Sequence, residues 1–154
     1  MEIREPRENE YGSIYLMGFD VWSDGKSEEK YVKQCSESKK YKTGTWYVLE
    51  SENVLVSSLI VYESQFGIPE NFCGIGSVAT AIQHRNKGHS SQLINDVCEK
   101  LKSSGYSGVY LHSDIDPEFY KRLGFIPVST EVTNCMVRLF GSVKVPENEI
   151  PSYF

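Results

Sequence analysis

The sequence predicts an α/β fold, a mixed sheet with helices on its faces. Segments rich in β-branched and aromatic residues recur along the chain, most clearly at residues 45–50, 53–63 and 108–112. Segments with apolar residues at helical spacing are interleaved with them, and the longest covers residues 89–104. Strands and helices that alternate in this way favour a mixed sheet over an all-helical or all-β fold.

The length and the charge of the chain limit what it can be. With 154 residues it has about the usual size of one domain, so we expect residues 1–154 to form a single domain. Hydrophobic residues make up 40% and charged residues 24%, which is ordinary for a globular protein. The net charge of −5 argues against a nucleic-acid partner, because phosphate backbones require a basic face.

The cysteines and the N-terminal residues indicate a cytoplasmic protein. Cys35, Cys73, Cys98 and Cys135 show neither a CxxC pair nor zinc-ligand spacing, so we expect reduced, buried thiols and no metal. The first residues, MEIREPRENE, are charged and do not form a secretory signal. Every apolar run is shorter than the roughly 20 residues that a membrane span needs, so no membrane partner is expected.

The N-terminal third predicts a short strand followed by two helices. The strand covers residues 1–5. Residues 10–22 carry apolar side chains at near-helical spacing, with Asn9 as the expected cap. A second helix follows Ser27, whose position before two glutamates is typical of a helix start, and we expect it to end before Tyr41.

The middle of the chain predicts a hairpin and a third strand. Residues 45–50 and 53–63 read as paired strands joined by Ser51 and Glu52. The third strand, residues 73–82, consists mostly of small residues. Glycines inside a strand indicate a bulge or the close approach of another backbone or a ligand.

The C-terminal part predicts a helix, a strand, a short helix, two strands and an irregular tail. These elements are expected at residues 89–104, 108–112, 117–123, 125–129, 133–140 and 145–154. Gly105 and Gly124 follow the two helices, and Pro117 opens the second one. These are the positions that glycine and proline favour at helix ends.

A basic stretch, HRNKGHSSQL from His84 to Leu93, stands out in this acidic chain. It joins a predicted strand to a helix whose first turn leaves N–H groups unpaired and carries partial positive charge. Gly88 lets a ligand approach the backbone, and Arg85 and Lys87 add full charges, so a phosphate or pyrophosphate fits. The motifs GxxxxGK[ST] and GxGxxG are both absent, and a solvated basic loop that only caps the helix stays open.

Two segments resemble the GCN5-related N-acetyltransferase (GNAT) family. QHRNKGHSSQLI is similar to its acetyl-CoA-binding pattern Q/R-x-x-G-x-G/A, with Arg85, Gly88 and Ser90 at the motif positions and Ser90 in place of the usual Gly or Ala. PEFYKRLGFIPV, residues 117–128, resembles the family's F/L/I-Y-x-K/R-x-G-F segment. Together the two motifs are more specific than either alone, and the resemblance covers residues 54–128.

The resemblance implies a GNAT-like fold whose central strands splay apart, here residues 73–82 and 108–112. The pantetheine arm of coenzyme A would pair with the backbone of residues 78–80, whose N–H groups would also stabilise the oxyanion. The basic loop would hold the pyrophosphate. The implied acetyl-CoA contacts are Val78, Ala79, Thr80, Arg85, Asn86, Lys87, Gly88, His89, Ser90, Ser91 and Tyr120.

The implied activity is acetyl transfer from acetyl-CoA to an amine by direct attack. Tyr120 stands where the family places a tyrosine general acid for the departing thiolate. The general base stays open, because residues 73–82 contain no acidic residue. Glu63, Asp114 and His112 are candidates, and so is a water chain to bulk solvent.

The acceptor is expected to be a small-molecule primary amine. LHSDIDPEFYKRLGF resembles fungal lysine acetyltransferases that act on the free amino acid. Tyr11, Tyr15, Phe19 and Trp22 either line the acceptor pocket or belong to the core. By analogy with family members that pair through C-terminal strands, a homodimer through residues 133–140 also stays open.

Three other functions remain open alongside the small-amine acetyltransferase. The first is a non-catalytic acyl-CoA-binding regulatory module, which would keep the basic loop without using Tyr120. The second is an acetyltransferase that acts on protein or peptide amines. The third is a binder of nucleotides or other phosphates on an unrelated α/β fold.

Overall fold

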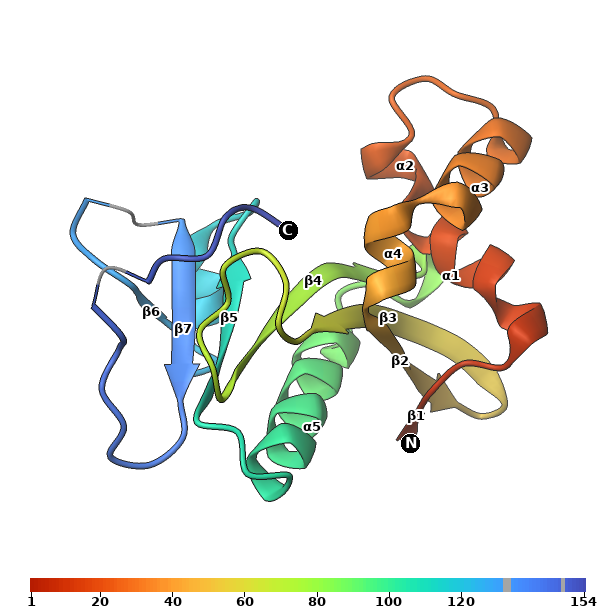
Figure 1. The fold of residues 1–154 in the computed structure, drawn as a ribbon. Helices are drawn as coiled ribbons and strands as arrows, with labels where there is room; N and C mark the ends of the chain where they lie inside the picture. The colour runs from red at the N-terminus through yellow and green to blue at the C-terminus, as the bar shows by residue number, and fades with distance from the viewer. Residues whose placement is uncertain (132–133, 148) are drawn as a thin grey trace. The chain divides into compact units, whose positions relative to one another are not determined.

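The computed structural model describes residues 1–131, 134–147 and 149–154 and confirms the mixed α/β fold. Its 7-stranded sheet has the order β1-β2-β3-β4-β5-β7-β6 (Figure 1). The strands are β1 (Glu2–Arg4), β2 (Thr45–Ser51), β3 (Val54–Tyr62), β4 (Phe72–Thr80), β5 (Gly108–His112), β6 (Ile126–Pro127) and β7 (Cys135–Leu139). The helices are η1 (Glu8–Glu10), α1 (Tyr11–Met17), α2 (Phe19–Trp22), α3 (Glu28–Glu37), α4 (Lys39–Thr43), η2 (Ile82–His84), α5 (His89–Ser103) and α6 (Pro117–Lys121).

The chain divides into two compact units. The first unit comprises Met1–Ile60 and Ser77–Ile94, and the second unit comprises Val61–Gly76 and Asn95–Phe154. The single-domain expectation therefore stays a prediction.

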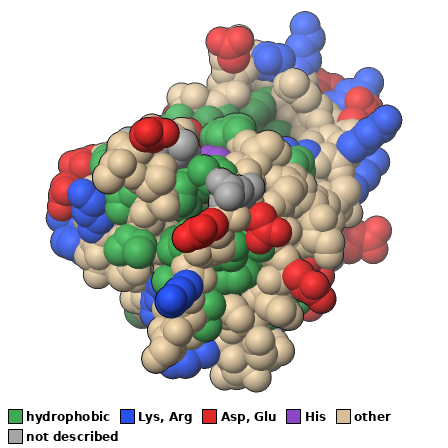
Figure 2. Space-filling model, turned by 60° about the vertical axis from the view of Figure 1, so that its left-hand side comes forward, with side chains coloured by type: hydrophobic (Ala, Val, Ile, Leu, Met, Phe, Trp, Pro, Cys, Tyr) green, Lys and Arg blue, Asp and Glu red, His purple; other side chains and the backbone are tan. Residues whose placement is uncertain are grey.

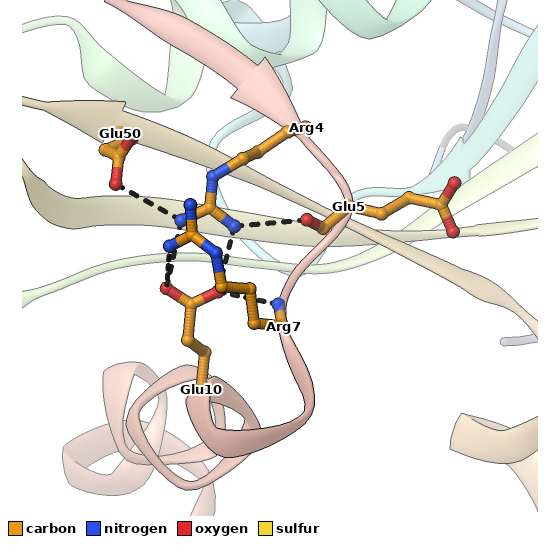
Figure 3. A network of polar contacts seen from close by, with 5 residues as sticks. All are labelled: Arg4, Glu5, Arg7, Glu10 and Glu50. Atoms are coloured by element: carbon orange, nitrogen blue, oxygen red, sulfur yellow. Dashed lines mark hydrogen bonds and ion pairs between the residues drawn. The ribbon is translucent and has the colours of Figure 1, made fainter.

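An arginine ties the first strand to the first helical turn. Strand β1 pairs antiparallel with β2. Arg4 donates to both carboxylate oxygens of Glu10, at 2.8 and 2.9 Å, and to Glu50 at 3.2 Å (Figure 3). The backbone N–H of Arg7 also donates to Glu10. These bonds, that from Arg4 first, lower the pKa of Glu10 to about 2, which keeps the carboxylate charged.

The helix predicted over residues 10–22 is broken. It divides at Gly18 into α1 and α2. The Trp22 ring packs so closely on Gly18 that a Cβ there would collide with it, so this position requires glycine. The predicted cap at Asn9 is wrong as well. Asn9 lies inside the 3₁₀ turn η1, and Glu10 occupies the N-cap position of α1.

The second predicted helix is confirmed as α3, but another helix follows it. Ser27 caps α3 by accepting a hydrogen bond from the backbone N–H of Lys30 at 3.3 Å. Ser38 then ends α3 in an extended conformation and caps α4 by accepting from the N–H of Tyr41 at 3.2 Å. Helix α3 thus ends before Tyr41 as predicted, whereas α4 was not predicted, because one serine both stops a helix and starts the next.

The hairpin of β2 and β3 turns one residue later than predicted. Its central residues are Glu52 and Asn53, with φ of 50° and 64°, instead of Ser51 and Glu52. Two left-handed residues match the twist of a tight hairpin, and asparagine tolerates that conformation better than serine. Strand β4 ends at Thr80, two residues before the predicted end, because η2 follows.

Most predicted elements of the second unit are confirmed. Strand β5 has the predicted bounds and pairs parallel with β4 and antiparallel with β7. Helix α5 ends as predicted at its glycine: the N–H groups of Gly105 and Tyr106 donate to the carbonyls of Lys102 and Leu101. Strand β6 covers only Ile126–Pro127 of the predicted residues 125–129. Thr133, where the last strand was predicted to begin, and Asn148 in the predicted tail lie outside the described residues.

The cysteines are buried in the core, whereas some large apolar side chains are exposed. All four cysteines are free and buried, as predicted. Hydrophobic side chains also reach the surface in the view of Figure 2. Those of the second unit that are large and exposed are Ile115, Ile126, Val143, Ile150 and Tyr153. The homodimer stays a prediction.

The described residues offer neither a cluster of metal ligands nor a membrane-spanning helix. No group of three or more His, Cys, Asp or Glu side chains among them is arranged to hold a metal ion. Of the helices in this part of the chain, none is long and apolar enough to cross a membrane.

Candidate active site

The basic loop of the first unit presents backbone to solvent at the start of α5. Asn86 and Gly88 both have left-handed backbone, with φ of 62° and 80°, and both are exposed. A Cβ at Gly88 would meet no atom within 4 Å, so a ligand can approach the main chain there. Because α5 begins at His89, the N–H groups of its first turn have no acceptor within the helix. Such a turn can bind an anion.

Arg85 is held by the first unit instead of extending into the loop. Its Nη1 and Nη2 donate to the two carboxylate oxygens of Asp20 at 2.7 and 2.8 Å. Nη2 also donates to the carbonyl of Met17 at 3.1 Å, and Nε to that of Thr80 at 2.9 Å. The hydrogen bond to Asp20 raises the pKa of Arg85 and lowers the pKa of Asp20. The predicted contact of Arg85 with pyrophosphate stays a prediction, and Arg85 already joins α1 and α2 to the end of β4.

Lys87 carries the positive charge of the loop that faces solvent. Its side chain is exposed, and within the described part of the chain it forms no ion pair. His89, Ser90 and Ser91 follow in the first turn of α5 and are half-buried. The His89 ring packs edge-on against that of His84, and its buried Nδ1 has no hydrogen-bond partner among the described residues.

Strand β4 changes character at Ser77. This residue has φ of 48° within the strand, and the side chains before it are buried whereas those from Ser77 onward are half-exposed. A left-handed residue inside a strand is the conformation that a bulge requires. Farther along the strand, the carbonyls of Ala79 and Thr80 accept from Ser57 Oγ and Arg85 Nε at 2.8 and 2.9 Å. One lone pair of each carbonyl is therefore in use within the first unit.

An aromatic cluster of the first unit is joined to this point of β4. Ser77 Oγ donates to the hydroxyl of Tyr41 at 3.2 Å. The Tyr41 ring stacks on Tyr15 and meets Trp46 edge-on, with centroids 6.0 and 5.1 Å apart. Tyr15 in turn contacts Tyr11. The sequence indicated Tyr11 and Tyr15 as pocket or core residues. It missed Tyr41, because α4 carried no helical pattern, and it placed Trp46 only in a strand.

Tyr120 is buried in the second unit on α6. The helix starts as predicted, with Pro117 in its first turn and Asp116 accepting from the N–H of Glu118 at 3.0 Å. The Tyr120 ring meets Phe119 and Phe125 edge-on. Burial, and next the charge of Asp114, raise the pKa of Tyr120 to about 12. The phenol therefore stays protonated at neutral pH, as a general acid must.

The three candidate bases already have partners within the second unit. Glu63 accepts a hydrogen bond from the hydroxyl of Tyr106, which raises the pKa of that phenol. Asp114 accepts from Tyr153 at 2.8 Å. His112 Nε2 lies 3.0 Å from the carbonyl of Ser152, and its ring packs against the rings of Tyr153 and Phe154. The sequence predicted the tail as irregular and did not indicate that it would reach two of these residues.

Comparison with known proteins identifies the family to which this chain is similar. A family model described as an acetyltransferase (GNAT) domain matches residues 2–128. No curated protein sequence matches the chain.

Solved structures similar to the chain share its fold at low identity. A GNAT family acetyltransferase from Brucella melitensis in complex with acetyl-CoA is 18% identical with a TM-score of 0.71, covering 99% of this chain and 95% of that one. A spermidine N-acetyltransferase chimera from Vibrio cholerae and hSSAT is 14% identical, with a TM-score of 0.67 and coverage of 90% and 96%. The PaiA N-acetyltransferase from Thermoplasma acidophilum in complex with coenzyme A is 14% identical, with a TM-score of 0.65 and coverage of 90% and 98%.

Proposed function

Because the chain belongs to the GNAT acetyltransferase family, we propose that it transfers an acetyl group from acetyl-CoA to the primary amine of a small molecule. The observation that carries this proposal is the loop around Gly88. It occupies the family's motif positions, its backbone is open to a ligand, and a helix begins directly after it. The similar structures support the cosubstrate, since one is a complex with acetyl-CoA and another a complex with coenzyme A.

The proposed coenzyme contacts divide by role. Residues 86–91 would bind the pyrophosphate through first-turn N–H groups, serine hydroxyls and the charge of Lys87. Arg85 would act as a positioning residue, because its guanidinium holds α1 and α2 against the carbonyl of Thr80. Residues 78–80 would pair with the pantetheine arm through the backbone groups that remain free.

The proposed reaction is a direct attack of the amine on the thioester. The neutral amine nitrogen attacks the thioester carbonyl carbon, so that a C–N bond forms and the carbonyl oxygen becomes negative. The oxyanion then re-forms the carbonyl as the C–S bond breaks, and the bonding electron pair leaves with sulfur. Tyr120 donates its proton to the thiolate, the nitrogen loses its extra proton to water or to a base, and the Tyr120 phenolate takes up a proton from solvent. The prediction that residues 1–154 act as one cytoplasmic N-acetyltransferase domain is part of the same proposal, supported by a family match that extends into both units.

A pair of glycine variants tests the coenzyme site by calorimetric titration with acetyl-CoA. Gly88 and Gly105 have left-handed φ of 80° and 95°, and a Cβ at either would meet no atom within 4 Å. Either alanine substitution should cost about 1 kcal/mol of stability from backbone strain. Only Gly88→Ala places a methyl group where the ligand would lie, so its affinity for acetyl-CoA should fall about tenfold, or about 1.4 kcal/mol.

The outcomes separate the open alternatives. Binding to the wild type that only Gly88→Ala weakens, with thiol released when primary amines are added, would support the proposal. Binding without thiol release from any amine would favour the regulatory module. If the wild type does not bind acetyl-CoA at all, the proposal is refuted.

A further inference from the structure

A cleft in the first unit has a basic lining in an acidic chain. Its volume is about 720 Å³. The lining residues are Trp22, Lys26, Lys30, Tyr31, Lys33, Gln34, Cys35, Glu37, Ser38, Lys40 and Tyr41. Among these described residues four lysines face a single carboxylate, that of Glu37, whereas the chain as a whole has a net charge of −5. The cleft therefore carries local positive charge against the average of the molecule.

Three of these lysines lack a direct ion pair among the described residues. Arg4, Arg85 and Arg138 each form an ion pair with a carboxylate. Across the described part of the chain, no ion pair includes Lys26, Lys30 or Lys33. Lys30 and Lys33 stand three residues apart on α3, where like charges repel each other. An anionic ligand would remove this repulsion.

Charged side chains are visible at the top of the molecule in Figure 2. Both Lys30 and Lys33 of α3 are exposed. A dissolved anion can reach them without any rearrangement of the unit.

One residue of the cleft lining is hydrogen-bonded to strand β4, next to the residues that the proposed function assigns to acetyl transfer. Tyr41 lines the cleft, and its hydroxyl accepts the hydrogen bond from Ser77 at 3.2 Å. Ser77 directly precedes residues 78–80, to which the proposed function assigns the pantetheine arm and the oxyanion. Trp22 and Tyr31 add aromatic surface to the lining. An amine bound near Tyr41 would have the rest of its chain along these rings.

We propose that this cleft binds the acceptor and that the acceptor is a primary amine with an anionic group, such as a carboxylate, at its far end. The lysines bind the anionic group, the aromatic wall contacts the connecting carbons, and the amine lies at the Tyr41 end. A polycationic amine would meet like charges instead. This proposal rests on the proposed function.

Three five-carbon amines test the charge preference. Pentylamine, cadaverine and δ-aminovalerate share the reacting amine and differ at the far end, which is apolar, cationic and anionic respectively. With saturating acetyl-CoA, δ-aminovalerate should have the highest kcat/KM and cadaverine the lowest. In the double variant Lys30→Gln/Lys33→Gln the KM for δ-aminovalerate should rise about tenfold, equivalent to about 1.4 kcal/mol.

A charge-matched control keeps this result specific. Lys102→Gln/Lys144→Gln removes two exposed lysines that do not line the cleft and should leave all three KM values within about twofold. Acetyl-CoA affinity should be equal in all three proteins. Equal or faster acetylation of cadaverine, or an equal loss in both double variants, would overturn the proposal.

A binding measurement is independent of turnover. Trp22 lines the cleft and is 40% exposed, so its fluorescence should respond to δ-aminovalerate, and the response should vanish in Trp22→Phe and weaken in Lys30→Gln/Lys33→Gln. If acetyl-CoA does not bind but this response persists, the anion site stands and the proposed function fails. If acetyl-CoA binds and turns over but δ-aminovalerate gives no response, the cleft proposal fails by itself.

Discussion

Removing the ion pair between Asp20 and Arg85 should lower the stability of the protein without lowering its affinity for acetyl-CoA. The substitution Asp20→Asn keeps the shape of the side chain and removes its charge. Arg85 donates to both carboxylate oxygens of Asp20, at 2.7 and 2.8 Å. The asparagine amide has a single acceptor oxygen, so one of these hydrogen bonds is lost and the other loses its charged acceptor. The carbonyls of Met17 and Thr80 would continue to hold the guanidinium in place.

The expected loss of stability is about 1 kcal/mol. A hydrogen bond to a charged group contributes about 1.5 to 3 kcal/mol when it is shielded. Both side chains are about a third exposed, at 33% and 36%, so solvent screening reduces that figure. For a chain of this size, 1 kcal/mol corresponds to a fall of about 2 to 4 °C in the melting temperature.

The pH dependence has a definite sign. Arg85 lowers the pKa of Asp20 in the folded state, so the stabilisation is complete above the unfolded value of about 3.9 and is lost as the pH falls through the folded pKa. The difference in melting temperature between wild type and Asp20→Asn should therefore be largest at neutral pH and shrink below about pH 4.

Calorimetric melting from pH 7 to 3 gives the assay, and Glu118→Gln gives the control. Glu118 forms an exposed ion pair with Lys121 on α6, and its loss should shift stability by less than about 0.5 kcal/mol. Acetyl-CoA affinity should be unchanged or higher in Asp20→Asn, because the charge of Arg85 is no longer neutralised. A large loss of affinity with unchanged stability would refute the view of Arg85 as a positioning residue.

Two other predictions follow from the buried phenol and the Arg4 network. Tyr120→Phe should lower kcat about a hundredfold while acetyl-CoA affinity stays within about twofold, and an unchanged rate with several amines would remove its role as general acid. Glu10→Gln should destabilise the protein by about 1 to 2 kcal/mol at neutral pH, because its carboxylate accepts from Arg4 and Arg7. The pKa of Glu10 falls from 4.5 to about 2 on folding, so this difference should be lost in melts between those pH values, whereas a constant difference would contradict it.

The elements that could be predicted are those with a local chemical signal at both ends. Strand β5 runs from Gly108 to His112 as predicted, and α6 has its proline at the start and a glycine after its end. Ser27 signals the start of α3 because its side chain can accept from a helical N–H. In these cases the residues that set a boundary lie within a few positions of it.

The features that could not be predicted depend on contacts distant in sequence. The break at Gly18 is a local exception, where the Trp22 ring packs on the glycine in a way that no periodicity describes. The partner of Arg85 is Asp20, 65 residues away, so the motif arginine could be assigned a phosphate but not its actual acceptor. The hydrogen bond from Tyr153 to Asp114 likewise depends on where the tail runs.

The position of Arg85 also links two binding events inside the first unit. Its guanidinium joins α1 and α2 to the end of β4, and the loop that begins with it continues into α5. Trp22 of α2 is part of the lysine-lined cleft. A ligand in the cleft that orders α2 would thus favour the same arrangement of the loop that coenzyme A requires. Such coupling is reciprocal, so each ligand would raise the affinity for the other by one common factor, and the two substrates would bind cooperatively.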